Sequence, residues 1–322
     1  MPMPMESWNT EEVHCSQIDW EDRSFRLTYS RPLTALATSI KGIGLQNLPV
    51  LQKKEGNRFR IVSGFRRLQV LSGNNMGSLR CRTAPIEADP RNLFFFNFQE
   101  NLDRGFNTIE QSWVLKGLSE LMERGELIRY ILPLLGLPPK EEILRRSLGL
   151  TEISPLYWPF VLEGRLFPEV IQELVQAHRR QADLILALFI QFRWSFQKQR
   201  EFLKDLLELA QRSGEPPGMI LTSESFVSIL LRITGGTPQQ RGEEVRKFFR
   251  NRLFPVLSKT ESRLAGQVAE MGLDSRTRLM PPPFFEGGQY ALEIKFSDPE
   301  ELKASLGKVG RAVASGKLDH LP

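Results

Sequence analysis

The turn at residues 61–71, IVSGFRRLQVL, carries the side chains of this sequence best suited to binding phosphate groups. Ser63 and Gly64 end an apolar, strand-like run, and Arg66 and Arg67 open the helix-like run that follows. A glycine lets the backbone approach a ligand closely, and the first N–H groups of a helix have no partner within it. The stretch therefore predicts a phosphate site. The alternative is a surface turn with two solvated arginines.

A second group of polar side chains lies in QENLDRGFNTIEQ, residues 99–111. Glu100 and Asn101 supply oxygen atoms of the kind that Mg²⁺ prefers when substrate phosphates complete its coordination. Arg104 follows Asn101 by one helical turn and offers a fork of donors to a phosphate. The motif predicts a metal and phosphate site, and the alternative is a helix end closed by a local ion pair.

Positive charge is concentrated again near the C-terminus. Residues 241–263 contain seven Lys or Arg against three Glu, with phenylalanines and leucines between them. This pattern predicts an amphipathic helix whose basic face includes Arg246, Lys247 and Arg250. The face either contacts nucleic-acid phosphates or is only solvated.

Apolar spacing and turn residues predict the elements that position these motifs. Short strands and helices alternate first, which indicates a compact mixed α/β unit. Its expected elements are a strand at 25–30, a helix at 33–44, a hairpin at 48–62 turning at 55–57, a helix at 66–71 and a strand at 79–86. Helical spacing dominates after residue 90, with a break near 103–108. The chain ends in a strand pair turning at Gly287-Gly288 and a helix capped by Ser297 or Asp298.

These patterns predict an α+β fold in five parts. The parts are a flexible arm (1–24), a mixed α/β domain (25–100), a helical domain (101–214), a basic helical segment (215–275) and a small strand–strand–helix element (276–322). Two strands with one helix are marginally stable by themselves, so we expect the last part to serve in dimerisation.

Composition excludes several classes of protein. The chain has 322 residues, 41% of them hydrophobic and 25% charged, with a net charge of +5 and a pI near 9.3, so a modest preference for anionic partners is expected. No apolar run approaches the roughly 18 residues of a transmembrane helix, and no secretory pattern is visible at the N-terminus. Cys15 and Cys81 do not suit a disulfide framework, and three histidines do not suit a zinc site. We expect a cytoplasmic location and no membrane partner.

Three stretches, taken in order, resemble the ParB family of chromosome and plasmid partition proteins. LATSIKGIGLQNLPVL resembles the family's helix, glycine turn and proline-bearing strand, RIVSGFRRLQVL its strand–GERR–helix, and QENLDRGFNTIEQSWVL its ENxQRxxLxxxEEA. The resemblance covers residues 25 to 180, about half of the chain. It implies a ParB/sulfiredoxin-like nucleotide-binding domain at 25–100 and a helical domain with a degenerate helix-turn-helix at 101–214.

The resemblance also implies a ligand and partners. In the family this fold binds CTP with Mg²⁺, and CTP closes a dimeric clamp around DNA. The positions carried over are Ser63, Gly64, Arg66, Arg67 and Arg104 for the phosphates, Glu100 and Asn101 for Mg²⁺, and Gly44 and Gln46 for the base and ribose. The implied partners are DNA, a second copy of the chain and a partition ATPase, in a nucleoid-associated setting.

Two departures from the family pattern change what is expected. Phe65 stands where the family has a glutamate, and a phenylalanine can neither orient water nor balance a metal, so we expect weak CTPase activity or none. In the helix-turn-helix region, Pro138-Pro139 lengthens the turn and Lys140 precedes two glutamates that would repel phosphates. Arg145 and Arg146 remain candidates for contacts to the DNA backbone.

Three functions are open from the sequence. The first is a DNA-associated ParB-like dimer that binds CTP or is derived from one that did. The second is a nuclease or phosphotransferase on the same scaffold, with Glu100, Asp103 and Glu110 as candidate metal ligands. The third is an adaptor that kept the fold and lost the nucleotide.

Overall fold

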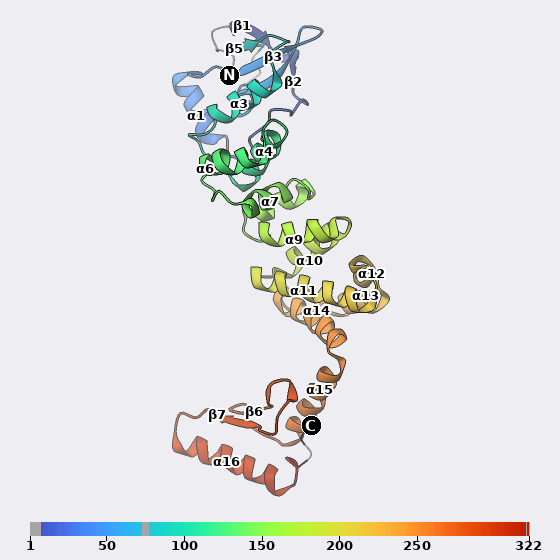
Figure 1. Cartoon of the computed structure of the whole chain (residues 1–322). Helices are drawn as coiled ribbons and strands as arrows, with labels where there is room; N and C mark the ends of the chain where they lie inside the picture. The colour runs from blue at the N-terminus through green and yellow to red at the C-terminus, as the bar shows by residue number, and fades with distance from the viewer. Residues whose placement is uncertain (1–7, 73–76, 320, 322) are drawn as a thin grey trace. The chain divides into compact units, whose positions relative to one another are not determined.

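The structure, a computed structural model, describes residues 8–72, 77–319 and 321 (Figure 1). The chain divides into two compact units, residues 1–199 and 200–322. The first unit combines a five-stranded sheet with helices, and the second combines helices with a two-stranded sheet. The predicted α+β class is confirmed, while the finer division into five parts stays a prediction.

The five-stranded sheet of the first unit is mixed. Its strands are β1 (Asn9–His14), β2 (Ile18–Asp19), β3 (Val50–Lys54), β4 (Arg58–Ser63) and β5 (Ser78–Ala84), in the spatial order β1-β5-β3-β4-β2. The pairs β1–β5 and β3–β4 are antiparallel, and the pairs β3–β5 and β2–β4 are parallel. The predicted hairpin and the predicted strand near 79–86 are both confirmed, with Gly56 and Asn57 at positive φ in the hairpin turn.

The prediction of a flexible arm at residues 1–24 is wrong for residues 9–19. Strand β1 pairs with β5 from Asn9↔Thr83 to His14↔Ser78, and β2 pairs with β4. In β1 only Val13 is buried, so its polar neighbours hide the strand pattern from a reading of hydrophobicity. The segment before Trp8 lies outside the described residues.

The strand predicted at residues 25–30 is also wrong, because this segment has no regular secondary structure. Phe25 and Leu27 are buried, which produces the alternating pattern, and they pack in a cluster with residues of both the sheet and the helices. Side chains of α3 and of the turn after it satisfy the backbone: Asn97 donates to the Phe25 carbonyl over 2.6 Å, and Arg104 donates to the Leu27 carbonyl over 2.7 Å.

The helices of the first unit confirm the predicted helices at 33–44 and 66–71 and the break near 103–108. They are α1 (Thr34–Ile43), α2 (Phe65–Ser72), α3 (Pro90–Glu100), α4 (Thr108–Ser119), α5 (Arg124–Glu126), a π-helical turn (Leu127–Ile131), α6 (Leu132–Leu134), α7 (Glu141–Gly149), α8 (Trp158–Leu162), α9 (Pro168–His178) and α10 (Ala182–Phe192). Asn101 is the C-cap residue of α3, and Asn107 with Glu110 forms a capping box on α4, so polar residues close both sides of the break.

Two buried clusters hold the sheet of the first unit to its helices. Val50 and Val62 point into one cluster with residues of α3 and α4, whereas their neighbours Leu51 and Ile61 point into the other. Alternate residues of a strand face opposite sides of the sheet, so the clusters lie on its two faces. Phe65 packs against both, and it therefore anchors the start of α2.

The second unit is mostly helical. Its elements are most of α11 (Phe196–Ser213), then α12 (Pro217–Thr222), α13 (Glu224–Arg232), α14 (Pro238–Leu253), α15 (Pro255–Glu270), β6 (Thr277–Met280), β7 (Ala291–Ile294) and α16 (Pro299–Ala314). The terminal strand pair and helix are confirmed, with Asp298 as the cap, although the first strand begins at Thr277, earlier than expected. Among the described residues, no helix has the length and apolar character needed to cross a membrane.

Candidate phosphate-binding site

The turn between β4 and α2 strongly favours a glycine at position 64. Gly64 has a φ of +91°, a region that other residues rarely adopt. A Cβ placed there would lie 3.0 Å from both Cα and Cβ of Pro49. The glycine therefore brings the backbone into close contact with Pro49 at the start of α2, as the sequence predicted for a phosphate-binding turn.

Two buried polar atoms beside this glycine have no hydrogen-bond partner. They are Oγ of Ser63, whose residue is fully buried, and Nε of Arg66. Leaving a buried donor or acceptor unpaired is unfavourable, and native proteins rarely tolerate it without a reason. Arg66 lines the cavity over this turn and Ser63 does not, so a ligand in that cavity would complete the Arg66 donor only.

A cavity of about 330 Å³ opens over the turn. It brings together Gly64, Arg66, Arg67, Asn101 and Arg104, five of the residues predicted from the sequence. The volume lies at the lower end of the range for small-molecule sites. Residues that the sequence did not single out complete the lining, among them Thr28, Leu36, Asn47 and Asn97. They converge only through folding.

Backbone carbonyl groups orient the two arginines of α2. Arg66 donates through Nη2 to the Pro32 carbonyl over 2.8 Å, and Arg67 donates through Nη1 to the Asn47 carbonyl over 2.7 Å. Arg67 also contacts a carboxylate oxygen of Glu100 at 3.0 Å. Carbonyl partners fix the position of a guanidinium without neutralising it, so Arg66 keeps an uncompensated positive charge at the cavity.

Arg104 lines the same cavity, but the protein uses its donors. Its Nε donates to Oδ1 of Asn101 over 2.6 Å, its Nη1 contacts Glu110 at 3.1 Å, and its Nη2 donates to the Leu27 carbonyl. Burial lowers the pKa of Arg104, while the charge of Glu110 opposes that effect. Arg104 therefore ties the 27–28 segment to α4 in addition to facing the cavity.

Glu110 is a buried carboxylate at the centre of this tie, and its side chain has no exposed surface. It accepts hydrogen bonds from the Arg31 side chain and from the backbone N–H groups of Tyr29 and Asn107. Burial would raise the pKa of Glu110, but these hydrogen bonds and the charge of Arg104 outweigh it and hold the pKa below its ordinary value. The carboxylate is thus ionised and fully engaged.

The residues predicted to hold Mg²⁺ do not fit the ion in this arrangement. Oδ1 of Asn101 accepts from Arg104, and Oε1 of Glu100 accepts from Arg67. Glu110, a further candidate, is occupied by its own donors. Among the described residues, no cluster of three or more His, Cys, Asp or Glu side chains could hold a metal ion. The arginines that line the cavity are donors of the kind that phosphate groups accept.

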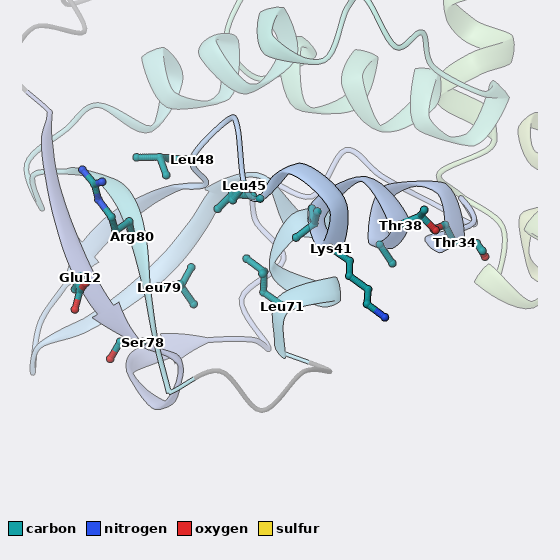
Figure 2. Close-up of a pocket in the computed structure, with 13 residues that line it drawn as sticks. Glu12, Thr34, Thr38, Lys41, Leu45, Leu48, Leu71, Ser78, Leu79 and Arg80 are labelled. Carbon is teal, nitrogen blue, oxygen red and sulfur yellow. The ribbon is translucent and has the colours of Figure 1, made fainter.

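The two residues predicted to lie near the base and ribose fall outside the phosphate cavity. Gly44 lines a larger cavity of about 920 Å³, where Figure 2 shows Lys41 on α1 and Leu79 on β5. Gln46 is exposed and lines neither cavity. Its neighbour Asn47 lines the cavity over the turn.

The candidate DNA contacts of the helical domain lie at the start of α7 and along it. Lys140 and Arg145 are exposed, whereas Arg146 pairs with Glu169 at 2.7 Å and with Glu142 at 3.1 Å. The other glutamate of that turn, Glu141, accepts from Nε of Arg124 over 2.8 Å, and this hydrogen bond lowers its pKa. Both glutamates expected to repel phosphates are therefore balanced by arginines.

Carboxylates also compensate the basic residues of the second unit. Arg246 pairs with Glu201 and, at 3.1 Å, with Glu243, and Arg250 pairs with Glu261 at 2.6 Å. Within the described part of the chain, Lys247 forms no ion pair and is exposed. Of the three candidates on α14, two are thus neutralised within the unit.

No protein-family model matches the sequence, and no curated protein matches it. Solved structures of ParB proteins are similar to it. The C-terminally truncated ParB of Caulobacter crescentus complexed with CTP-γ-S has 17% identity and a TM-score of 0.26, covering 56% of this chain and 99% of that one. The same protein complexed to the centromeric parS site has 16% identity and a TM-score of 0.33, covering 59% and 96%.

A Pnob8-like ParB-N domain has 11% identity and a TM-score of 0.37, covering 71% of this chain and 98% of that domain. These three structural neighbours are ParB proteins. At TM-scores and identities this low, they say nothing about the ligand of this chain, which has to be inferred from its own site.

Proposed function

We propose that this chain is a ParB-like, DNA-associated protein that holds the phosphates of a nucleotide, CTP, at the turn from Ser63 to Arg67. The observation that supports this most is the unpartnered, buried Nε of Arg66 at the cavity, next to a glycine whose positive φ other residues rarely adopt. The choice of CTP among nucleotides rests on the three sequence stretches alone.

In this proposal each residue of the turn has a separate task. Gly64 lets the backbone approach the phosphates. The first N–H groups of α2, which form the positive end of the helix dipole, would donate to them. Arg66 and Arg67 supply charge and fork-shaped donors. Arg104 holds the 27–28 segment in place through the Leu27 carbonyl and so shapes the wall of the cavity.

Hydrolysis is not part of the proposal. Phe65 lines the cavity at the position where an acidic group would orient water, and its ring packs against both buried clusters. We therefore expect bound nucleotide to persist. The nuclease alternative is disfavoured because Glu110, one of its three candidate ligands, already accepts from Arg31, Arg104 and two backbone amides.

The remaining parts of the proposal concern partners. DNA would contact the exposed Lys140 and Arg145 at α7, and a second copy of the chain would pair through the element at 276–322. The proposal further includes a partition ATPase as a partner. It also includes a cytoplasmic, nucleoid-associated location for the chain. A native mass measurement of the full chain tests the dimer, and anisotropy with labelled duplex DNA tests the contacts at α7.

Calorimetric titration tests nucleotide binding directly. Wild type, Arg67→Ala and the control Arg91→Ala receive CTP, ATP and GTP, each with and without Mg²⁺. Arg91 is exposed at the start of α3 and lines none of the cavities described, so its loss removes one charge without touching the site. We expect CTP to bind wild type and Arg91→Ala, and Arg67→Ala to lose at least about tenfold in affinity. Equal affinity in all three proteins would refute the proposal.

A further inference from the structure

A second, smaller cavity lies next to the phosphate site. Its volume is about 240 Å³, and Arg23, Arg26 and Arg66 line it, with Trp20 among the other lining residues. Arg66, Phe65 and Thr28 line both this cavity and the phosphate cavity. The two cavities therefore meet at the side chain of Arg66. The sequence patterns did not predict the second cavity.

The charged residues that line this second cavity are all positive. Three guanidinium groups line it, and none of its lining residues is acidic. Asp22, which precedes Arg23, is engaged elsewhere, because it accepts from Ser24 over 2.6 Å and pairs with Lys54 at 3.1 Å. No carboxylate of the described residues forms an ion pair with any of the three arginines, so their charge is uncompensated.

The donors of these arginines are also incompletely used. Arg26 donates through Nε to the Thr28 carbonyl over 3.0 Å, and Arg66 donates through Nη2 to the Pro32 carbonyl, which leaves its buried Nε without a partner. Burial lowers the pKa of Arg26, and the nearby charge of Arg23 lowers it further. Like charges held together at partial burial are unfavourable, and a bound anion would relieve that cost.

Neighbouring elements fix the frame of the cavity. Trp20 donates through its indole Nε1 to the Cys15 carbonyl over 3.2 Å, and the backbone N–H of Arg26 donates to the Arg23 carbonyl over 2.9 Å. The second bond closes a turn that places Arg23 and Arg26 on the same segment. The arginines thus stand on a folded loop tied to β2, not on a free arm.

We propose that this cavity is an anion subsite that receives a further phosphate group of the same ligand whose phosphates occupy the Ser63–Arg67 turn. The inference rests on the proposed function, because it extends that site across Arg66. The ligand class it specifies is a small polyphosphate compound whose phosphate chain is longer than the turn alone accommodates. Arg66 would bridge consecutive phosphates, and Arg23 and Arg26 would bind the distal one through charge-assisted hydrogen bonds.

The test uses inorganic pyrophosphate, tripolyphosphate and tetrapolyphosphate as probes, titrated calorimetrically into the full chain. The variant is Arg23→Gln/Arg26→Gln, and the matched control is Arg80→Gln/Arg91→Gln, which removes two exposed arginines that do not line this cavity. We expect the affinity of wild type and control to rise with chain length. In the Arg23→Gln/Arg26→Gln protein, tetrapolyphosphate should bind about tenfold more weakly, whereas pyrophosphate should change by less than about twofold.

The outcomes separate this inference from the proposed function. If Arg67→Ala abolishes binding of every probe while Arg23→Gln/Arg26→Gln keeps the full dependence on chain length, the turn binds phosphate and the second subsite does not exist. If no probe binds wild type, both the phosphate site and the subsite are overturned. Thermal unfolding of each variant verifies that a lost affinity reflects a lost contact and not a lost fold.

Discussion

Two regions of this chain concentrate arginine near a cavity, and they differ in the groups that contact the arginine side chains. At the turn from Ser63 to Arg67, Arg66 is held by a backbone carbonyl and retains its charge, whereas Arg67 is held by a backbone carbonyl and also pairs with Glu100. On α14, Arg246 and Arg250 are held by the carboxylates of Glu201, Glu243 and Glu261. The second region also has a cavity, of about 580 Å³, but acidic and basic residues line it together.

The comparison shows that a count of basic residues does not measure the charge available to a ligand. The α14 region is the more basic in sequence, with seven Lys or Arg between residues 241 and 263. Yet Arg246 is balanced by Glu201 of α11, and Arg250 is balanced by Glu261 of α15. The proposal of a phosphate site therefore depends on the type of partner, which is a carbonyl at Arg66 and a carboxylate at Arg246 and Arg250.

The largest loss of stability should follow the removal of a buried carboxylate. Glu110→Ala leaves Arg31 and Arg104 partly buried without their counter-charge, so we expect the first unit to lose about 3–5 kcal/mol of stability. The exposed Glu142, which pairs with Arg146, is the matched control, and Glu142→Ala should cost less than about 1 kcal/mol. Urea unfolding of the three proteins measures both. Similar losses for the two variants would contradict the assignment of Glu110 as the buried tie.

Glu110 should also give stability a recognisable pH dependence. Its folded pKa lies below its ordinary value of 4.5, so its contribution is present above that value and is lost as the pH falls through the folded pKa. Wild type should therefore lose stability on acidification below about pH 4.5, more steeply than Glu110→Gln. Urea unfolding between pH 3 and pH 7 compares the slopes, and parallel curves would remove Glu110 as their cause.

A smaller loss is expected at the glycine of the turn. In Gly64→Ala the new Cβ meets Pro49 at 3.0 Å and the residue keeps a positive φ, so about 1–3 kcal/mol of stability should be lost together with phosphate binding. Gly42→Ala is the control, because a Cβ there meets nothing within 4 Å. Thermal unfolding and triphosphate titration of both variants check this. A Gly64→Ala protein that binds as well as wild type would exclude close backbone approach.

The smallest effect on stability is expected in the second region, on removing a carboxylate that pairs with an arginine of α14. Glu261→Gln removes the partner of Arg250, an exposed pair whose loss should change stability by less than about 1 kcal/mol. It should also free a guanidinium on α14 and raise the affinity for duplex DNA by about twofold at low salt. Anisotropy with labelled DNA measures this, with Glu300→Gln, at the exposed Lys303 pair, as the control. No gain would mean that charge compensation does not limit this surface.

The sequence predicted the strand–glycine–helix geometry of the turn because its signals are local, and phosphate binding there stays a prediction. A strand, a glycine and two arginines within a few residues determine the geometry that Gly64 and α2 adopt. The residues that complete the cavity, such as Thr28 and Asn97, are separated from the turn by tens of residues. Their convergence depends on the packing of α3 against β4, which no pattern of spacing reveals.

Other predictions failed or changed for the same reason. Phe25 and Leu27 alternate like a strand, but Asn97 of α3 and Arg104 of the turn after α3 supply the partners of their carbonyl groups. Arg104 was expected to serve a phosphate, and the structure gives it a second task through Glu110. In each case the sequence pattern describes the residue itself, and a contact with a residue distant in the sequence gives it a different or additional role.

The most direct test compares the two regions with one ligand. Inorganic triphosphate is titrated calorimetrically into wild type, Arg67→Ala and Arg250→Ala, at equal ionic strength and without Mg²⁺. Each variant loses one arginine, so a general charge effect would weaken binding equally in both. We predict that Arg67→Ala loses at least about tenfold in affinity and that Arg250→Ala stays within about twofold of wild type. Equal losses, or a larger loss in Arg250→Ala, would contradict a phosphate site at the Ser63–Arg67 turn.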